Sequence, residues 1–179
     1  KAGVISFSGN ALIKQDLTDS RDMMRAAIND IEISEISGTD IYEAVITGTN
    51  ILKGENSKAI VLLSDGQLNV GSIGDAVEYA NKNDVVVHTI AIGTVEGGET
   101  SYGLSKLDED SLKALSYNTD GAFFSAKNEK ELLNSFNDAI GKTEKKVAIN
   151  ISNYLIIASI LLFALEYFLT MELFFAIGL

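Results

Sequence analysis

The chain has 179 residues, 46% of them hydrophobic, and this length suits one domain with a sizeable core plus a short additional segment. Its formal net charge is −11, from 25 acidic and 14 basic residues, which argues against nucleic acid as a partner because phosphate contacts need clustered Lys and Arg. The chain has no cysteine, so disulfides, thiol catalysis and cysteine-ligated zinc are excluded as well.

The first third of the chain is expected to form two strands and two helices. Residues 4–7 read as an apolar strand, and residues 11–13 suit an edge strand because polar residues follow them. An amphipathic helix is expected from Asp19 to about Ile33. Apolar residues recur at helical spacing after Gly38-Thr39-Asp40, which predicts a second helix that ends near Leu52.

A continuous apolar run, Ala59 to Leu63, leads directly into Ser64-Asp65-Gly66. Such a run is typical of a strand buried on both faces of a parallel sheet. The carboxylate of Asp65 should then lie at the carboxyl end of this strand, where open α/β sheets bind ligands and ions. Thr39 or Asp40 should lie near a helix N-terminus at the same edge. A hydroxyl and a carboxylate are hard oxygen ligands for Mg²⁺ or Ca²⁺, although two ligands are too few for a tight site.

The remaining elements continue the alternation of strands and helices. A β-branched run over residues 85–92 predicts a second buried parallel strand, and a third strand is expected at residues 121–125. His88 lies inside the second run and is interpreted as structural, because no Cys, second His or nucleophile accompanies it. The acidic residues 108–110 are expected to favour the N-terminal end of a short helix. This order predicts an α/β layer fold with right-handed crossovers.

Three motifs occur in the order found in the von Willebrand factor A (VWA) family, which the chain resembles from about residue 3 to residue 141. They are Gly38-Thr39-Asp40, Leu63-Ser64-Asp65-Gly66 and His88-Thr89-Ile90-Ala91-Ile92-Gly93. The resemblance implies a Rossmann-like fold, with a mostly parallel sheet and helices on both faces. In that family a metal-ion-dependent adhesion site holds Mg²⁺, with Ca²⁺ or Mn²⁺ as alternatives, through three loops. The resemblance assigns Thr39 to the second loop and Asp65 to the third.

The first metal loop of that family, Asp-x-Ser-x-Ser after the first strand, has no convincing match. Residues 1–10 resemble the family's second strand instead. Residues 16–20 match Asp-x-Thr-x-Ser formally, but no apolar strand closely precedes them, and helix capping by Thr18 explains them better. The resemblance therefore implies a VWA domain over residues 1–143 without its first central strand. Its site is incomplete, and residues 1–179 alone are expected to bind the ion weakly or not at all.

After a linker at residues 144–153, the segment from Tyr154 to Leu179 is predicted to be a transmembrane helix. Its unbroken apolar part ends at Leu165 and is too short, so spanning requires Glu166 to lie near an interface or against a partner helix. The alternative is a hydrophobic helix packed on the domain. Lysines before the segment place the domain in the cytoplasm by the positive-inside rule, whereas the family resemblance implies the opposite side.

A VWA domain followed by an apolar helix resembles the Bat aerotolerance-type membrane proteins, which accompany MoxR-type AAA ATPases. This resemblance implies a membrane-anchored interaction module rather than an enzyme. Mg²⁺ held partly by Thr39 and Asp65 would take a carboxylate from a protein partner, such as a MoxR-type system or another Bat protein. One alternative is a scaffold subunit of a chelatase-like or channel-like complex that needs no metal. A nucleotide or phosphoryl-transfer enzyme is less favoured, because phosphate-binding glycine motifs and a Ser/His/Asp set are missing.

Overall fold

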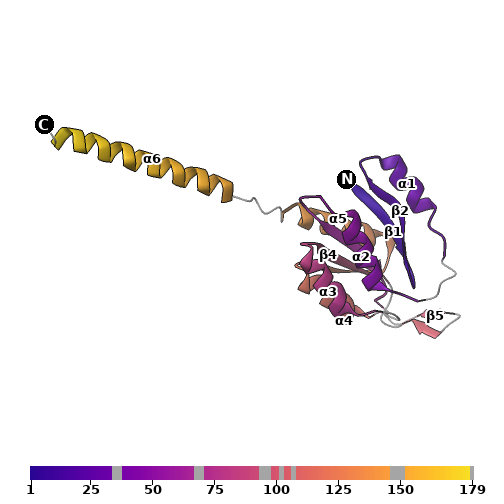
Figure 1. Cartoon of the computed structure of the whole chain (residues 1–179). Coiled ribbons are helices and arrows are strands. Elements are labelled where there is room, and N and C mark those ends of the chain that lie inside the picture. The colour runs from indigo at the N-terminus through magenta and orange to yellow at the C-terminus, as the bar shows by residue number, and fades with distance from the viewer. Residues whose placement is uncertain are drawn as a thin grey trace. The chain divides into compact units, whose positions relative to one another are not determined.

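The computed structural model describes residues 1–33, 38–66, 71–92, 98–100, 103–105, 108–145 and 152–177. The chain divides into two compact units, Lys1–Lys145 and Lys146–Leu179. The first unit is an α/β domain, as predicted, and the second contains one long helix (Figure 1). The sequence-based boundaries at residues 1–143, 144–153 and 154–179 stay predictions.

An antiparallel hairpin begins the domain. Strand β1 (Ala2–Phe7) pairs with β2 (Ala11–Thr18), and helix α1 (Arg21–Asn29) follows. The second strand is longer, and the helix shorter, than the sequence predicts. The later start of the helix follows from its cap: Ser20, not Thr18, is the N-cap, and its hydroxyl accepts a hydrogen bond from the N–H of Met23 at 3.3 Å. The helix ends at Asn29, four residues before the expected end.

Three parallel strands form the centre of the domain. Strands β3 (Ala59–Ser64), β4 (Val86–Ile92) and β7 (Phe123–Ala126) pair in the order β3-β4-β7. These parallel pairings confirm the predicted fold class. The run that begins at Ala59 is less buried than the sequence predicts: only Leu62 in β3 is buried, and the other five residues are half-buried. Among the described strands β3 pairs with β4 alone, so its other edge has no neighbouring strand.

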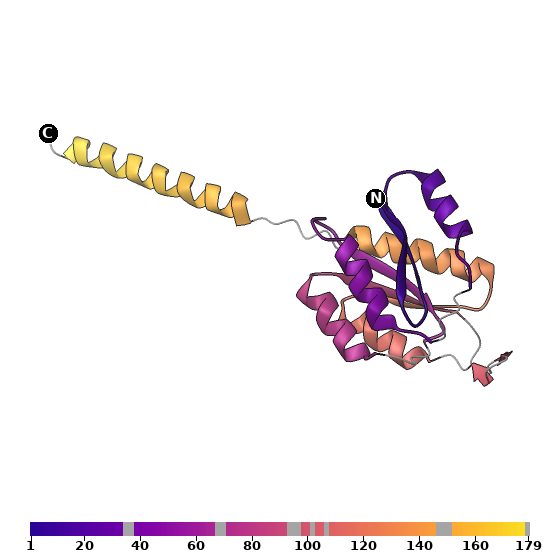
Figure 2. The same cartoon turned by 45° about the vertical axis from the view of Figure 1, so that its right-hand side comes forward.

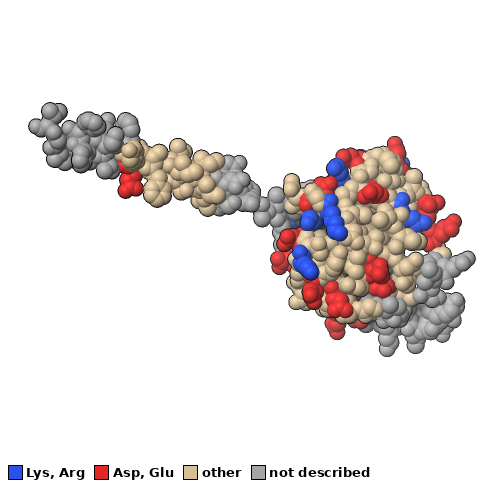
Figure 3. Space-filling view, in the orientation of Figure 1, with Lys and Arg blue, Asp and Glu red and all other residues tan. Residues whose placement is uncertain are grey.

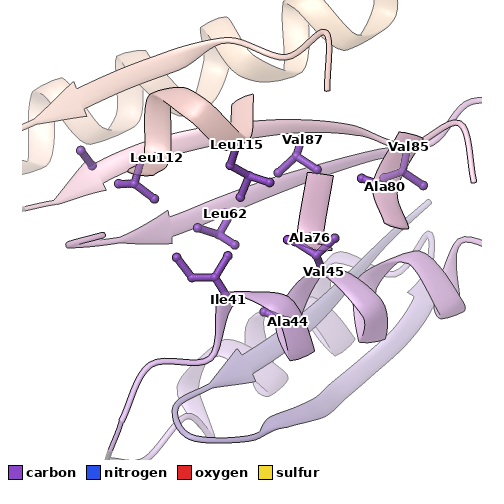
Figure 4. Close-up of a cluster of buried hydrophobic side chains, with 11 residues drawn as sticks. Ile41, Ala44, Val45, Leu62, Ala76, Ala80, Val85, Val87, Leu112 and Leu115 are labelled. Carbon is purple, nitrogen blue, oxygen red and sulfur yellow. The ribbon is translucent and has the colours of Figure 1, made fainter. Parts of the chain in front are cut away.

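Helices cover the two faces of this sheet. On one face lie α2 (Ile41–Ile51), α3 (Ile73–Lys82) and α4 (Glu109–Asn118), which contact one another in sequence order (Figure 2). Helix α5 (Glu129–Lys145) contacts β3, β4 and β7 and contributes nothing to the main core cluster. Figure 4 shows that cluster, which joins side chains from the three helices to β3, β4 and the residue before β4. Its members are Ile41, Ala44, Val45, Leu62, Ala76, Ala80, Val85, Val87, Ala91, Leu112 and Leu115.

A small hairpin follows β4. Strands β5 (Gly98–Thr100) and β6 (Gly103–Ser105) pair with each other in antiparallel register and contact no other helix or strand that the structure describes. The sequence predicts only a surface loop here. The difference arises because the pattern of the segment is too short and too polar to mark strands.

The structure does not support the transmembrane prediction for Tyr154–Leu179. Residues Ser152–Ile177 form one helix, α6, whereas Leu179 lies outside the described residues. Across the ranges that the structure describes, no helix is both long enough and apolar enough to cross a bilayer.

Candidate functional site

Asp65 lies directly after β3, at the carboxyl ends of the parallel strands, as its position in the sequence predicts. We call this side of the sheet the carboxyl edge. The carbonyl of Asp65 accepts a hydrogen bond from the N–H of Asp108 at 2.9 Å. Gly66 has φ +80°, and a Cβ atom there would collide with the carbonyl oxygen of Asp108. The turn that carries Asp65 is therefore fixed against the start of α4.

Thr39 lies directly before the N-cap of α2 and is half-buried. The next residue, Asp40, is 6% exposed and caps the helix, because its Oδ1 accepts a hydrogen bond from the N–H of Glu43 at 3.0 Å. The N–H of Asp40 donates to the carbonyl of Ser8 at 2.7 Å. The loop that carries Thr39 is thus held between the β1–β2 turn and α2.

The loop after β3 reaches the loop before α2 through Gly71. This glycine has φ +81°, and a Cβ atom there would lie 2.9 Å from Oδ1 of Asp40 and 3.1 Å from Cβ of Tyr42. Gly71 follows Asp65 by six residues, of which 67–70 lie outside the described residues. The two loops therefore meet at the carboxyl edge. Sequence reasoning missed this contact, although a glycine just before a helix cap, Ser72, is a recognisable turn signal.

The electrostatic character of the carboxyl edge is acidic. Asp40 and Asp108 both cap helices, and Asp108 accepts from the N–H of Ser111 at 3.2 Å and from its hydroxyl at 2.8 Å. Glu109 and Asp110 lie in the first turn of α4, which confirms the predicted helix-dipole role of this acidic run. Within the described part of the chain, no three His, Cys, Asp or Glu side chains are grouped to hold a metal ion. Joint ligation by Thr39 and Asp65 remains a prediction.

His88 is buried in β4, 1% exposed, and its Nδ1 accepts a hydrogen bond from the N–H of Ala122 at 3.0 Å. This bond ties the central strand to the residue before β7. A nitrogen that accepts from a backbone amide carries no proton of its own, so His88 is neutral here, with its proton on Nε2. The geometry agrees with the structural role that the sequence predicts.

The chain matches the model of the von Willebrand factor type A domain over residues 1–139. It belongs to the VWA family. A curated relative, a UPF0353 protein from Nocardia farcinica, is 27% identical in an alignment 157 residues long that covers 73% of this chain and 47% of the relative. The chain therefore spans about half the length of that relative.

Two solved structures share the VWA fold with this chain. The conserved hypothetical protein BatB from Bacteroides thetaiotaomicron has a TM-score of 0.70 at 20% identity, covering 80% of this chain and 79% of BatB. An aerotolerance-related membrane protein from Bacteroides fragilis has a TM-score of 0.66 at 21% identity, covering 78% of each chain. The structural neighbours are thus Bat aerotolerance-related proteins. At 20–21% identity, the similarity shows that this chain shares their fold and nothing more.

Proposed function

We propose that this VWA domain is a protein-interaction module that binds its partner at the carboxyl edge. The observation that carries the proposal is the meeting of two loops there, where the backbone of Gly71 lies against the carboxylate of Asp40. Thr39 and Asp65 belong to these two loops and bring a hydroxyl and a carboxylate to one edge of the sheet. Oxygen donors without an accompanying nucleophile and base suit binding better than catalysis.

The binding is proposed to depend on a divalent cation. Thr39 and Asp65 would supply two hard oxygen ligands, the type that Mg²⁺ prefers, with Ca²⁺ and Mn²⁺ as alternatives. When bound, the ion would supply a coordination position that accepts a carboxylate from the partner protein. Because two residues fill only part of an octahedral shell, the expected affinity of residues 1–179 for Mg²⁺ alone is weak.

Partner class and location are proposed by analogy with the relatives. The Bacteroides fragilis protein is described as an aerotolerance-related membrane protein, which supports membrane association. Other Bat proteins or a MoxR-type ATPase are proposed as partners from the family resemblance alone. In α6, the side chains between Leu155 and Tyr167 are almost all apolar, and such a surface needs a lipid or protein environment. The domain surface in Figure 3 carries more acidic than basic side chains, which argues against a nucleic-acid role.

A Mg²⁺ titration followed by amide chemical shifts tests the proposal. We expect shifts at millimolar Mg²⁺ that are concentrated at Thr39, Asp65 and their neighbours. The substitution Asp65→Asn should remove them, because an amide binds Mg²⁺ far more weakly than a carboxylate. Asp138→Asn, an exposed position on α5, is the matched control and should leave them unchanged. Shifts spread evenly over surface carboxylates would instead support the metal-free scaffold function.

A further inference from the structure

The side chain of His88 adds a hydrogen bond to the pairing of β4 with β7. Among the described strands β7 pairs with β4 alone, over four residue pairs that begin with Thr89 and Phe123. Ala122, the residue before β7, extends this pairing in two ways. Its carbonyl accepts from the N–H of Thr89 at 3.1 Å, and its N–H donates to Nδ1 of His88 at 3.0 Å. The imidazole therefore takes the place of a backbone acceptor at the start of β7.

The chain that enters β7 is closely fixed against β4. Gly121 donates its N–H to the carbonyl of Ser116 at 2.7 Å, and a Cβ atom on Gly121 would collide with the carbonyl oxygen of Val87. His88 is 1% exposed, so water has no access to replace Nδ1 as the acceptor for Ala122. The N–H of Ala122 is therefore left buried and unbonded whenever Nδ1 stops accepting, which is costly for a backbone group.

The imidazole lies on the face of the sheet that α5 covers. Side chains along a strand alternate between the two faces of a sheet. Val87 belongs to the core cluster, and Thr89 donates its hydroxyl to the carbonyl of Leu112 in α4 at 3.0 Å, so both residues face α4. His88 lies between them and faces the opposite side, where α5 contacts β4 and β7. The side chain therefore lies where these three elements meet.

The charged groups on the elements around His88 lie at the surface. Strands β3, β4 and β7 contain no Asp, Glu, Lys or Arg, and Asp120, just before the turn into β7, is exposed. In the described part of α5 the buried residues are Ser135 and Ala139, whereas every charged side chain is exposed. These charged residues are Glu129, Lys130, Glu131, Asp138 and Lys142. Both signs occur among them, and water screens exposed charges, so they act weakly on a buried imidazole.

We propose that His88 is an acid-sensitive latch, which fastens β7 and α5 to the centre of the sheet at neutral pH and releases them when it takes up a proton. Protonation puts a hydrogen on both ring nitrogens, so Nδ1–H and the N–H of Ala122 would then face each other as two donors at 3.0 Å. The positive charge would also lie in a site that is 1% exposed. Both costs disappear when β7 and α5 move away and water reaches the ring.

The pH range in which the latch acts follows from the proton balance. In the latched state His88 has no proton on Nδ1, whereas in the released state it is an ordinary histidine in water, with a pKa of about 6.5. The latch is therefore fully effective above about pH 6.5 and weakens as the pH falls, because only the released state takes up the second imidazole proton. Between about pH 7.5 and pH 5.5 the population of the released state should rise about tenfold.

Nitrogen-15 NMR and amide exchange of residues 1–179 test the proposal, and the single histidine of the chain makes the imidazole signals unambiguous. At about pH 7.5 we expect the shifts of a neutral ring with Nδ1 unprotonated. Protection factors, which correct for the intrinsic pH dependence of exchange, should fall about tenfold for β7 and α5 on acidification to about pH 5.5. Those of β3 and α3 should stay unchanged, because these elements belong to the part of the domain that stays folded.

Two variants separate the proton from the hydrogen bond. His88→Asn places an amide oxygen near the position of Nδ1, where it accepts from Ala122 but does not titrate, so β7 and α5 should stay protected at both pH values. His88→Phe removes the acceptor, and their protection should be low at both. The proposal is overturned if Nδ1 carries a proton at neutral pH, if β3 and α3 lose protection by the same factor, or if the tenfold fall persists in His88→Asn. The first two of these outcomes are read from the wild type alone.

Discussion

The backbone of Gly71 lies against the carboxylate of Asp40, close enough that a Cβ atom would be 2.9 Å from Oδ1. This contact joins the loop after β3 to the N-cap of α2. It does so next to Thr39, one of the two residues assigned to the candidate site. The loops at the carboxyl edge therefore form one packed unit, and a change at Gly71 should be felt at the cap of α2.

Substitution of Gly71 by alanine should destabilise the domain in two ways. Its φ of +81° strains any residue with a Cβ atom, and that atom would also crowd Oδ1 of Asp40. Gly54 provides the control, because it has φ +90° and open space around it. We expect Gly54→Ala to cost about 1 kcal/mol and Gly71→Ala about 2–3 kcal/mol in urea unfolding. Equal losses for the two variants would mean that the Asp40 contact is unimportant.

Thr49 offers a stabilising substitution. Its hydroxyl is the one buried side-chain polar atom without a hydrogen-bond partner among the described residues, and Thr49 is 1% exposed. Thr49→Val keeps the shape and removes the unpaired group, so the free energy of unfolding should rise by about 1 kcal/mol.

Thr119 is the matched control for Thr49. It is also buried, but its hydroxyl donates to the carbonyl of Leu115 at 2.8 Å and accepts from the N–H of Val87 at 3.2 Å. Thr119→Val leaves that N–H unpaired and should cost roughly 1–3 kcal/mol. Thermal or urea unfolding should show a higher free energy of unfolding for Thr49→Val and a lower one for Thr119→Val. A loss of stability in Thr49→Val would show that its hydroxyl has a partner after all.

The start of α5 should make stability depend on pH. The N–H of Lys127 donates to Glu131 Oε2 at 2.9 Å, and the side-chain amide of Asn128 donates to Oε1 at 2.8 Å. The backbone bond first, and the Asn128 bond second, hold the pKa of Glu131 below its ordinary value. A carboxyl with a depressed pKa stabilises the fold above its unfolded pKa, and this contribution is lost as the pH falls through the folded pKa.

Glu131→Gln tests this pH dependence. The variant should have a lower melting temperature than the wild type at neutral pH, and the difference should shrink on acidification below the ordinary glutamate pKa. The effect is small because Glu131 is exposed. Glu129→Gln, in the same helical turn, is the control and should show no comparable pH-dependent difference. A Glu131→Gln difference that stays constant from pH 7 to pH 3 would argue against the capping role.

Local sequence patterns were sufficient to predict the parallel sheet and the position of Asp65. The runs before Asp65 and through His88 are apolar without alternation, and such runs form parallel strands in a layered fold. Asp65 follows its strand directly, so its position at the carboxyl edge needs no long-range information. The same local logic correctly placed the acidic residues at the start of α4.

Long-range contacts explain what the sequence did not predict. The half-burial of β3 depends on which strand lies beside it, and no residue within β3 encodes that. The Gly71–Asp40 contact joins residues from two separate loops, and the bond from Asp108 to Asp65 spans the segment with the β5–β6 hairpin. The α1 boundary was missed because Thr18 and Ser20 are both good caps, and only the paired strand shows which one starts the helix.

The claim that the two loops share one cation is tested most directly with Mn²⁺ as a paramagnetic replacement for Mg²⁺. Relaxation enhancement of amide protons at substoichiometric Mn²⁺ reports their distances from the ion. We predict the strongest enhancement at Thr39 and Asp65 together, competed away by Mg²⁺ and removed from both by Asp65→Asn. Enhancement at Asp65 without Thr39, or enhancement that persists in Asp65→Asn, would contradict a shared site at the carboxyl edge.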